Sequence, residues 1–351
     1  MSTDWSSHYT TGYAVYEVNP DTWLDGDEVA GLVSVDISTD ATDDTPMLET
    51  ASFTFEMDIS HDDFNGWYRL VAYVKQRNVT ERYPLTTQLL ESEGDNVSYG
   101  ISTIKISGSS VLKPASDREM LPGTYVPAKS NGIDYITNLL EDCVPAPIVV
   151  EGSGFVLDDY LTFSSGTTYL KAIWMILDTA NWCMQLDGNG VIYLRPKPDD
   201  PEFVFDRSAT NILQDKIART LDRSSVINQY IAIEADGKEE IAENTDPLSP
   251  VSIPYRNGRI VNKVDTSVKK IDGETLWGYA RRKLEEASTV VRTYTYTREY
   301  IPGLYPFDII KASLPNTGFS GDLRILSQKI SCGESISVSE TAGEEIKEFV
   351  A

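Results

Sequence analysis

Residues 164–194 read SSGTTYLKAIWMILDTANWCMQLDGNGVIYL, and this stretch decides most about the fold. Its first half carries apolar side chains at the i, i+3, i+4 and i+7 positions, the pattern of a helix with one buried face: Leu170, Ile173, Trp174 and Leu177. Two extended segments follow, 182–186 and 191–194. They flank Asp187-Gly188-Asn189-Gly190, whose residues tolerate positive φ. The stretch therefore predicts a helix followed by a β-hairpin, an α+β module.

The surrounding residues place this module in a small insert spanning 111–220. Asn131 is a good N-terminal cap for a shorter helix. Its apolar face is formed by Ile133, Ile136, Leu139 and Leu140. Pro145 and Pro147 end this helix, and a proline-rich stretch from Pro196 to Pro201 marks a stiff connection to the next region.

Before the insert, residues 1–110 alternate apolar and polar side chains, as half-buried strands do. The clearest alternating positions are Val33, Val35 and Ile37, followed by Phe53, Phe55, Met57 and Ile59. Further extended segments at 67–75 and 97–107 complete the pattern. This region is expected to form a small antiparallel barrel or sandwich.

After the insert, residues 221–333 are again rich in strands and contain one helix. Asp272 is a candidate cap for that helix. Its inward positions are Leu276, Ala280, Leu284 and Ala287. Residues 334–351 form an acidic C-terminal tail. The predicted fold class is α+β, mainly β, with two antiparallel β-barrel or sandwich domains and a small helix-plus-hairpin insert.

The strand at 290–300 has an unusual composition on both faces. Alternation places Arg292, Tyr294, Tyr296 and Arg298 together on one face and valine and threonine on the other. One interpretation is a solvent-facing ladder of tyrosine and arginine. The other is a subunit contact, because interfaces are enriched in these two residue types. Both remain open, and these four residues are the candidate subunit interface.

Charge and cysteine content exclude several classes of protein. The chain has 54 Asp plus Glu against 30 Lys plus Arg, a formal net charge of −24, so tight nucleic-acid binding is not expected. Cys143, Cys183 and Cys332 are far apart and are interpreted as reduced and buried, with a disulfide or zinc site as the alternative. No basic-then-apolar leader or long apolar run occurs, so neither a signal peptide nor stable membrane insertion is expected.

The search for catalytic residues finds no constellation. His8 and His61 are the only histidines, which argues against a histidine triad or a three-histidine metal site, and the segment 61–63 is interpreted as an acidic turn. Acid pairs at 158–159 and 199–200 are of the type that glycosidases use, but acids are so abundant that no pair stands out. The segment 25–28 resembles part of a calcium loop without the later ligands. No catalytic residue, cofactor or metal site is predicted.

The order of these modules resembles the baseplate hub and tail-tip hub proteins of long-tailed bacteriophages. Four segments carry the resemblance: the helix and hairpin within 164–193, Asn228-Gln229-Tyr230, the helix segment 279–284, and the turn and strand 301–310. In relatives this last turn often reads Pro-Gly-Asp. Here Phe307 stands at the glycine position, which leaves the local turn type open.

The resemblance implies a structural virion protein. It implies tail-tube-like β domains and a homo-oligomeric ring, commonly a trimer, at the distal end of the virion tail, assembled from chains made in the host cytoplasm. The implied partners are the tail tube or distal tail protein, the tape measure protein, and spike or fibre proteins. DNA passes only transiently, and an acidic channel lets it pass without sticking.

Two other classes of function remain as alternatives. A tail-associated peptidoglycan or polysaccharide hydrolase requires a groove holding two acids with separated pKa values. A carbohydrate-binding module requires exposed aromatic side chains, for which the candidates are Trp5, Trp23 and Trp67, although core packing is the commoner role for tryptophan.

Overall fold

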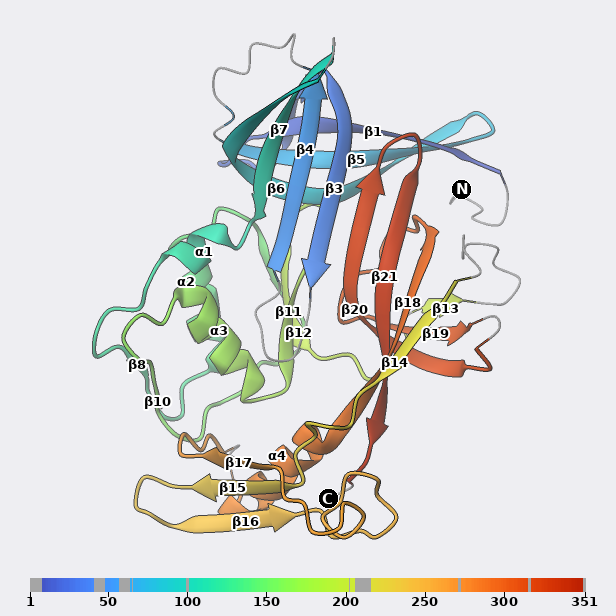
Figure 1. The fold of residues 1–351 in the computed structure, drawn as a ribbon. Helices are drawn as coiled ribbons and strands as arrows, with labels where there is room; N and C mark the ends of the chain where they lie inside the picture. The colour runs from blue at the N-terminus through green and yellow to red at the C-terminus, as the bar shows by residue number, and fades with distance from the viewer. Residues whose placement is uncertain are drawn as a thin grey trace.

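The computed structural model describes residues 8–40, 48–56, 64, 66–98, 101–201, 203–205, 216–270, 273–314 and 317–349. Its main feature is a 13-stranded sheet that runs through both ends of the chain (Figure 1). The N-terminal region contributes β1 (Thr10–Val18), β2 (Asp25–Val29), β3 (Leu32–Asp40), β4 (Leu48–Glu56), β5 (Gly66–Gln76), β6 (Val79–Ser98) and β7 (Ile101–Ser110). Alternation of apolar side chains in β3 and β4 buries Val35, Ile37, Phe53 and Phe55 on one face. Val33, predicted to belong to the same series, is exposed where the register with β4 shifts, and Met57 and Ile59 lie outside the described residues.

The C-terminal region supplies the rest of this sheet. Its strands are β13 (Phe203–Phe205), β14 (Ala218–Leu221), β18 (Thr289–Glu299), β19 (Ile309–Ser313), β20 (Ser320–Cys332) and β21 (Ile336–Lys347). The order is β14-β18-β21-β20-β3-β4-β7-β6-β5-β1-β2, with β19 and β13 as a side branch on β20. The mainly-β, α+β expectation is confirmed. Neither β region closes into a barrel within the described residues, because the sheet path has two ends.

One junction, β20 against β3, joins the two β regions. The strands are antiparallel from Ser327↔Asp40 to Cys332↔Val35. A single hydrophobic core lies beneath them and draws Val35 and Phe53 from the first region and Ile336 and Val338 from the second. The two regions therefore share a sheet and a core.

The insert packs beside this sheet (Figure 1). It contains α1 (Lys113–Asp117), β8 (Tyr125–Val126), α2 (Gly132–Glu141), β9 (Ile148–Val150), β10 (Leu161–Thr162), α3 (Tyr169–Asp178), β11 (Trp182–Leu186) and β12 (Ile192–Pro196). The structure contains the predicted helix α3 and the predicted antiparallel hairpin β11–β12. Asn131 caps α2 as expected, since its side chain accepts hydrogen bonds from the amides of Ile133 and Asp134.

A small three-stranded sheet lies at the opposite end from the N-terminal strands (Figure 1). It consists of β16 (Glu239–Glu243), β15 (Gln229–Ile233) and β17 (Asn262–Asp265), and α4 (Leu276–Ser288) packs on it. Leu276, Ala280 and Leu284 are buried as expected. The cap of α4 is Thr275, whose hydroxyl accepts from the Gly278 amide; Asp272 lies outside the described residues.

Residues 334–351, set apart above as an acidic tail, contribute strand β21. It lies between β18 and β20, inside the sheet. Ile336, Val338 and Ala342 alternate inward as in any half-buried strand, and Glu340 occupies the remaining inward position. Because the segment is rich in acidic residues, this alternation was not recognised in the sequence.

Cys183 and Cys332 are buried and Cys143 is half-buried, and all three are free thiols. Within the described residues, no helix has the length and apolar character that crossing a bilayer requires.

Candidate functional site

Three of the four candidate interface residues on β18 point into the subunit. Tyr294, Tyr296 and Arg298 are 1%, 3% and 1% exposed, whereas Arg292 is half-buried. The solvent-facing interpretation is therefore wrong for these three side chains. The three side chains already pack within their own chain. Contact between this strand and a second subunit stays a prediction.

The buried charge on this strand is held by Glu340 of β21, a fully buried carboxylate. Arg298 Nη2 lies 2.7 Å from Glu340 Oε2, and Gln328 Nε2 donates to the same oxygen at 2.8 Å. The hydroxyl of Tyr296 donates to the other oxygen. Burial, and then the charge of Glu340, raise the pKa of Tyr296 well above its usual value, so the phenol stays a donor. The cluster links β18, β21 and β20 by polar contacts.

The other two candidates have local partners. The Tyr294 ring packs 4.8 Å from the Phe319 ring, measured between centroids. Arg292 Nη1 lies 2.7 Å from Glu344 Oε2. All four residues lie on one face of one strand, as predicted, and each arginine has an acid on the neighbouring strand β21: the buried Glu340 for Arg298 and the half-buried Glu344 for Arg292.

The tip of the β11–β12 hairpin docks on the N-terminal strands. The Asn189 carbonyl accepts from Trp23 Nε1 at 2.8 Å and from Arg69 Nη2 at 2.9 Å. The Gly188 carbonyl accepts from the Thr87 hydroxyl at 3.1 Å. A Cβ on Gly188 would lie 2.0 Å from the Pro84 carbonyl oxygen. Only glycine permits this approach.

The same hairpin also contacts the C-terminal region, through side chains that bind Asp308. This carboxylate is 1% exposed and accepts from Gln185 Nε2 at 2.8 Å and Arg195 Nη2 at 2.7 Å. It also accepts from the Tyr305 amide at 2.8 Å. The hairpin thus contacts both β regions and acts as a strut between them.

Phe307, in the turn before Asp308, resolves the question of the turn type. Its φ is +79°, so the left-handed backbone that glycine would favour is kept with a phenylalanine. The ring is 1% exposed and packs against Trp174 of α3 at 6.4 Å between centroids. Burial of a large ring offsets the cost of the backbone conformation.

Glu49 of β4 is a second acid near the strut. Its carboxylate accepts hydrogen bonds from the side chains of Thr39, Thr86 and Gln88. Loss of water around it raises its pKa from 4.5 to about 7, against the opposing effect of those hydrogen bonds. Glu49 is therefore an acid whose charge changes near neutral pH.

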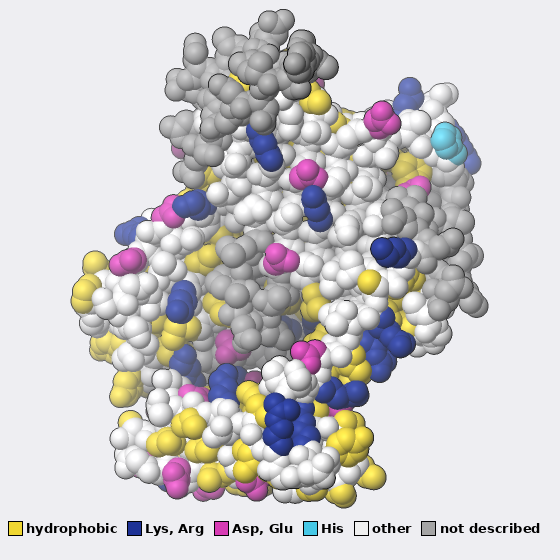
Figure 2. All heavy atoms as spheres, viewed as in Figure 1, with side chains coloured by type: hydrophobic (Ala, Val, Ile, Leu, Met, Phe, Trp, Pro, Cys, Tyr) yellow, Lys and Arg dark blue, Asp and Glu magenta, His cyan; other side chains and the backbone are white. Residues whose placement is uncertain are grey.

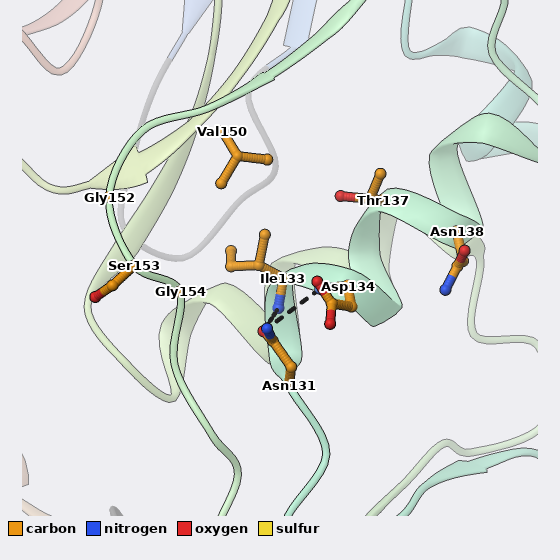
Figure 3. A pocket seen from close by; sticks show the side chains of 9 residues that line it. All are labelled: Asn131, Ile133, Asp134, Thr137, Asn138, Val150, Gly152, Ser153 and Gly154. Carbon is orange, nitrogen blue, oxygen red and sulfur yellow. Dashed lines mark hydrogen bonds between the residues drawn. The ribbon is translucent and has the colours of Figure 1, made fainter.

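A hollow of about 630 Å³ opens beside α2 and is lined by that helix and the loop 150–154 (Figure 3). Asn131 lies at its edge with its side chain turned to the amides of Ile133 and Asp134, as the dashed lines in Figure 3 show. Asp134 is the only titratable residue among those that line it. The hollow therefore lacks the two acids that hydrolysis of a glycoside needs.

The remaining sequence candidates lie apart from one another. Asp158 pairs with Lys129 at 2.6 Å, and Asp159, Asp199 and Asp200 are exposed. Asp25 of the calcium-like segment pairs with Arg69 and Arg82. The segment 61–63 lies outside the described residues. No group of three His, Cys, Asp or Glu arranged to hold a metal occurs in the described part of the chain.

The tryptophans proposed for carbohydrate contact are used differently. Trp23 is 8% exposed and packs 5.6 Å from Trp67, centroid to centroid. Trp67 is half-buried, and Trp5 lies outside the described residues. The two described side chains thus support the packing role.

Sequence reasoning missed the strut contacts of Gln185, Arg195 and Asp308. One signal was present: Gln185 is the only polar residue in the strand Trp182–Leu186, all of which is buried. A lone amide in such a strand needs a buried partner. The sequence does not reveal which partner, because Asp308 is over a hundred positions away.

No protein-family model and no curated protein sequence matches the chain. Solved structures match it over nearly its whole length. A tail protein from Neisseria meningitidis has a TM-score of 0.67 at 14% identity, covering 95% of this chain and 97% of that one. The 43 kDa tail protein of a Shewanella oneidensis prophage has a TM-score of 0.63 at 11% identity, covering 96% and 98%.

This chain has the fold of phage tail proteins. A prophage tail protein from Listeria monocytogenes has it too, with a TM-score of 0.56 at 11% identity over 96% of this chain and 95% of that one. Since each match covers both chains almost completely, the tail-protein fold includes the insert and both β regions. The resemblance drawn from the order of the four segments is confirmed at the level of the fold.

Proposed function

We propose that this chain is a structural protein of a phage-type tail that assembles into a trimeric hub ring at the distal end. In this role it joins the tail tube and the tape measure protein to tail-tip, spike or fibre proteins, and DNA crosses the ring during ejection. The chain would be made in the host cytoplasm. The observation that carries the proposal is the near-complete, two-way match to tail proteins.

The arrangement of the two β regions supports a ring-forming subunit. They share one sheet and one core through the β20–β3 junction, and the hairpin braces them at two separate points. A subunit with two β units, residues 1–110 and a second unit that includes β21 and so extends past residue 333, lets three copies present six units to a six-fold tube. A braced pair keeps those units at a fixed angle, as ring closure requires.

The charge of the chain fits a channel for DNA. With a net charge of −24, a ring of three copies would be strongly acidic. Phosphates are repelled by such a surface, so DNA would pass without forming stable contacts.

A structural rather than enzymatic role is supported by the positions of the acids. Glu340 and Asp308 are both buried and already satisfied by donors from neighbouring strands. The exposed pair at 199–200 consists of neighbours in a solvated connection. These acids hold the fold together or face solvent.

Imaging of native particles tests the proposal. Antibody against this chain should label the distal end of the tail in particles that contain it, and purified chain should give ring-shaped class averages with a central opening. Label along the tail shaft or on the capsid would contradict the hub assignment. Lysis of cell walls by the purified chain, abolished by one Asp or Glu substitution, would establish the hydrolase instead.

A further inference from the structure

The 13-stranded sheet ends in two short open strands. Its path stops at β14 on one side and at β2 on the other, apart from the side branch that ends in β13. Beyond their ladders with β18 and β1, residues 218–221 and 25–29 form no backbone hydrogen bond with another described residue. An unpaired strand edge presents amides and carbonyls on which a further strand can add.

The β2 edge is acidic. Asp25 is neutralised by Arg69 and Arg82, but Asp27 and Glu28 are exposed and have no ion-pair partner among the described residues. Asp21, just before the strand, is exposed as well. The accessible charge on this edge is therefore negative.

The β14 edge is basic. Lys216 and Arg219 are exposed and form no ion pair within the described part of the chain. Arg292 lies on the neighbouring strand, paired with Glu344. Two acids flank this segment in the sequence: Asp222 directly follows β14, and Asp215, next to Lys216, lies outside the described residues. In Figure 2 dark blue side chains gather over this part of the molecule. A cationic edge stands out on a chain of net charge −24.

Charges on an edge strand usually prevent two edges from pairing. If both edges carried the same charge, any two edges would repel each other. With opposite charges, only β14 against β14 and β2 against β2 are disfavoured. A β14 edge meeting a β2 edge would bring opposite charges together. Their lengths agree too, at four and five residues.

We propose that β14 of one copy pairs with β2 of a second copy, head to tail, which brings the exposed Lys216 and Arg219 into the same contact as the exposed Asp27 and Glu28. The inference deepens the proposed ring function and rests on it. Each copy offers one edge of each kind, so the contact is heterologous and either closes into a ring or continues as a filament. A ladder this short is weak alone, and its surface ion pairs are screened by salt.

Charge reversal tests the pairing. One variant carries Asp27→Lys and Glu28→Lys, a second carries Lys216→Glu and Arg219→Glu, and a third carries all four substitutions. The mass of each full-length chain is followed by light scattering over a concentration series. Either two-residue variant should need on the order of tenfold more protein to assemble than the wild type. The four-residue variant, in which the edges are again complementary, should assemble like the wild type.

The matched control is Asp199→Lys with Asp200→Lys, which reverses two adjacent exposed acids that belong to neither edge strand and should assemble normally. Thermal unfolding shows that each variant is folded. If the wild type assembles and both edge variants assemble equally well, the pairing is wrong while the hub proposal stands. Mass that grows without limit supports the pairing and contradicts the ring. A wild type that stays monomeric at every concentration overturns both.

Discussion

At the scale of single residues, Glu340 explains the unusual strand β18. It is a carboxylate in a row of apolar positions, and Arg298, Tyr296 and Gln328 direct their polar groups at it. A buried ion pair contributes little net stability compared with apolar side chains, but removing one partner leaves an uncompensated charge. The cluster therefore specifies which strands pair, and in which register.

Replacing Arg298 with methionine should lower the free energy of unfolding by about 3–5 kcal/mol, because Glu340 then stays buried without its cation. Adding Glu340→Leu should recover most of that loss. Denaturant unfolding of both variants measures the effect, with the exposed Lys329→Met as control. An Arg298→Met variant as stable as the control would contradict this account of the cluster.

Tyr294→Ala combined with Tyr296→Ala should destabilise the single chain, since both side chains are buried and their removal leaves a cavity. The loss expected for large aromatic side chains is about 3–5 kcal/mol for each. Thermal unfolding of the monomer is the measurement. A fully stable monomer with weakened self-association would instead restore the subunit-contact interpretation of these residues.

Glu49 should make stability depend on pH. Its pKa is raised from 4.5 to about 7, so the folded chain holds this proton more tightly than the unfolded chain between those values. Its contribution is fully present below pH 4.5 and is lost as the pH rises through 7. Glu49→Gln should therefore gain stability relative to the wild type, by up to about 3 kcal/mol, between about pH 5 and pH 8. An unchanged difference across that range would contradict it.

At the scale of elements, the β11–β12 hairpin holds the two β regions together. Its tip accepts hydrogen bonds from Trp23, Arg69 and Thr87. Its Gln185 and Arg195 side chains donate to Asp308. Both sets of contacts are buried or nearly so. Breaking either set would leave buried donors or acceptors without hydrogen bonds, which lowers the free energy of unfolding.

Gly188→Ala should detach the tip of the hairpin, because the added Cβ would meet the backbone of Pro84, which cannot turn away as a side chain can. We expect a loss of about 1–3 kcal/mol and faster amide exchange in β11 and β12. Gly12→Ala, where the added Cβ meets nothing within 4 Å, is the control. Unchanged exchange in the hairpin would show that the strut does not depend on this approach.

The elements that the sequence predicted well are those specified by neighbours in the chain. Helix α3, the cap at Asn131 and the hairpin turn each depend on a few adjacent residues. The β20–β3 junction was missed, because strand pairing across almost three hundred positions leaves no local pattern. Strand β21 was missed for a different reason: Glu340 interrupts an alternation that otherwise includes Ile336, Val338 and Ala342.

The candidate site divides in the same way. The period of two placed Tyr294, Tyr296 and Arg298 on one face correctly, since that follows from strand geometry alone. Whether that face meets solvent, another subunit or its own core depends on what covers it, and the cover comes from β21 and β20. Asp308 was likewise recognised as part of a turn but not as the partner of Gln185 and Arg195.

At the scale of the whole molecule, a braced pair of β regions ends in two open and oppositely charged edges. Such a subunit is fully folded but leaves two strand edges without a partner strand. The matches to tail proteins cover 95% and 96% of this chain. We therefore expect copies of the chain to assemble into a closed ring.

The mass of the purified chain in solution tests that claim most directly. Light scattering across a concentration series should converge on three times the 39.0 kDa chain mass and stop there, because a closed ring has no free edge left. A mass that stays at that of one chain throughout the series would contradict the account.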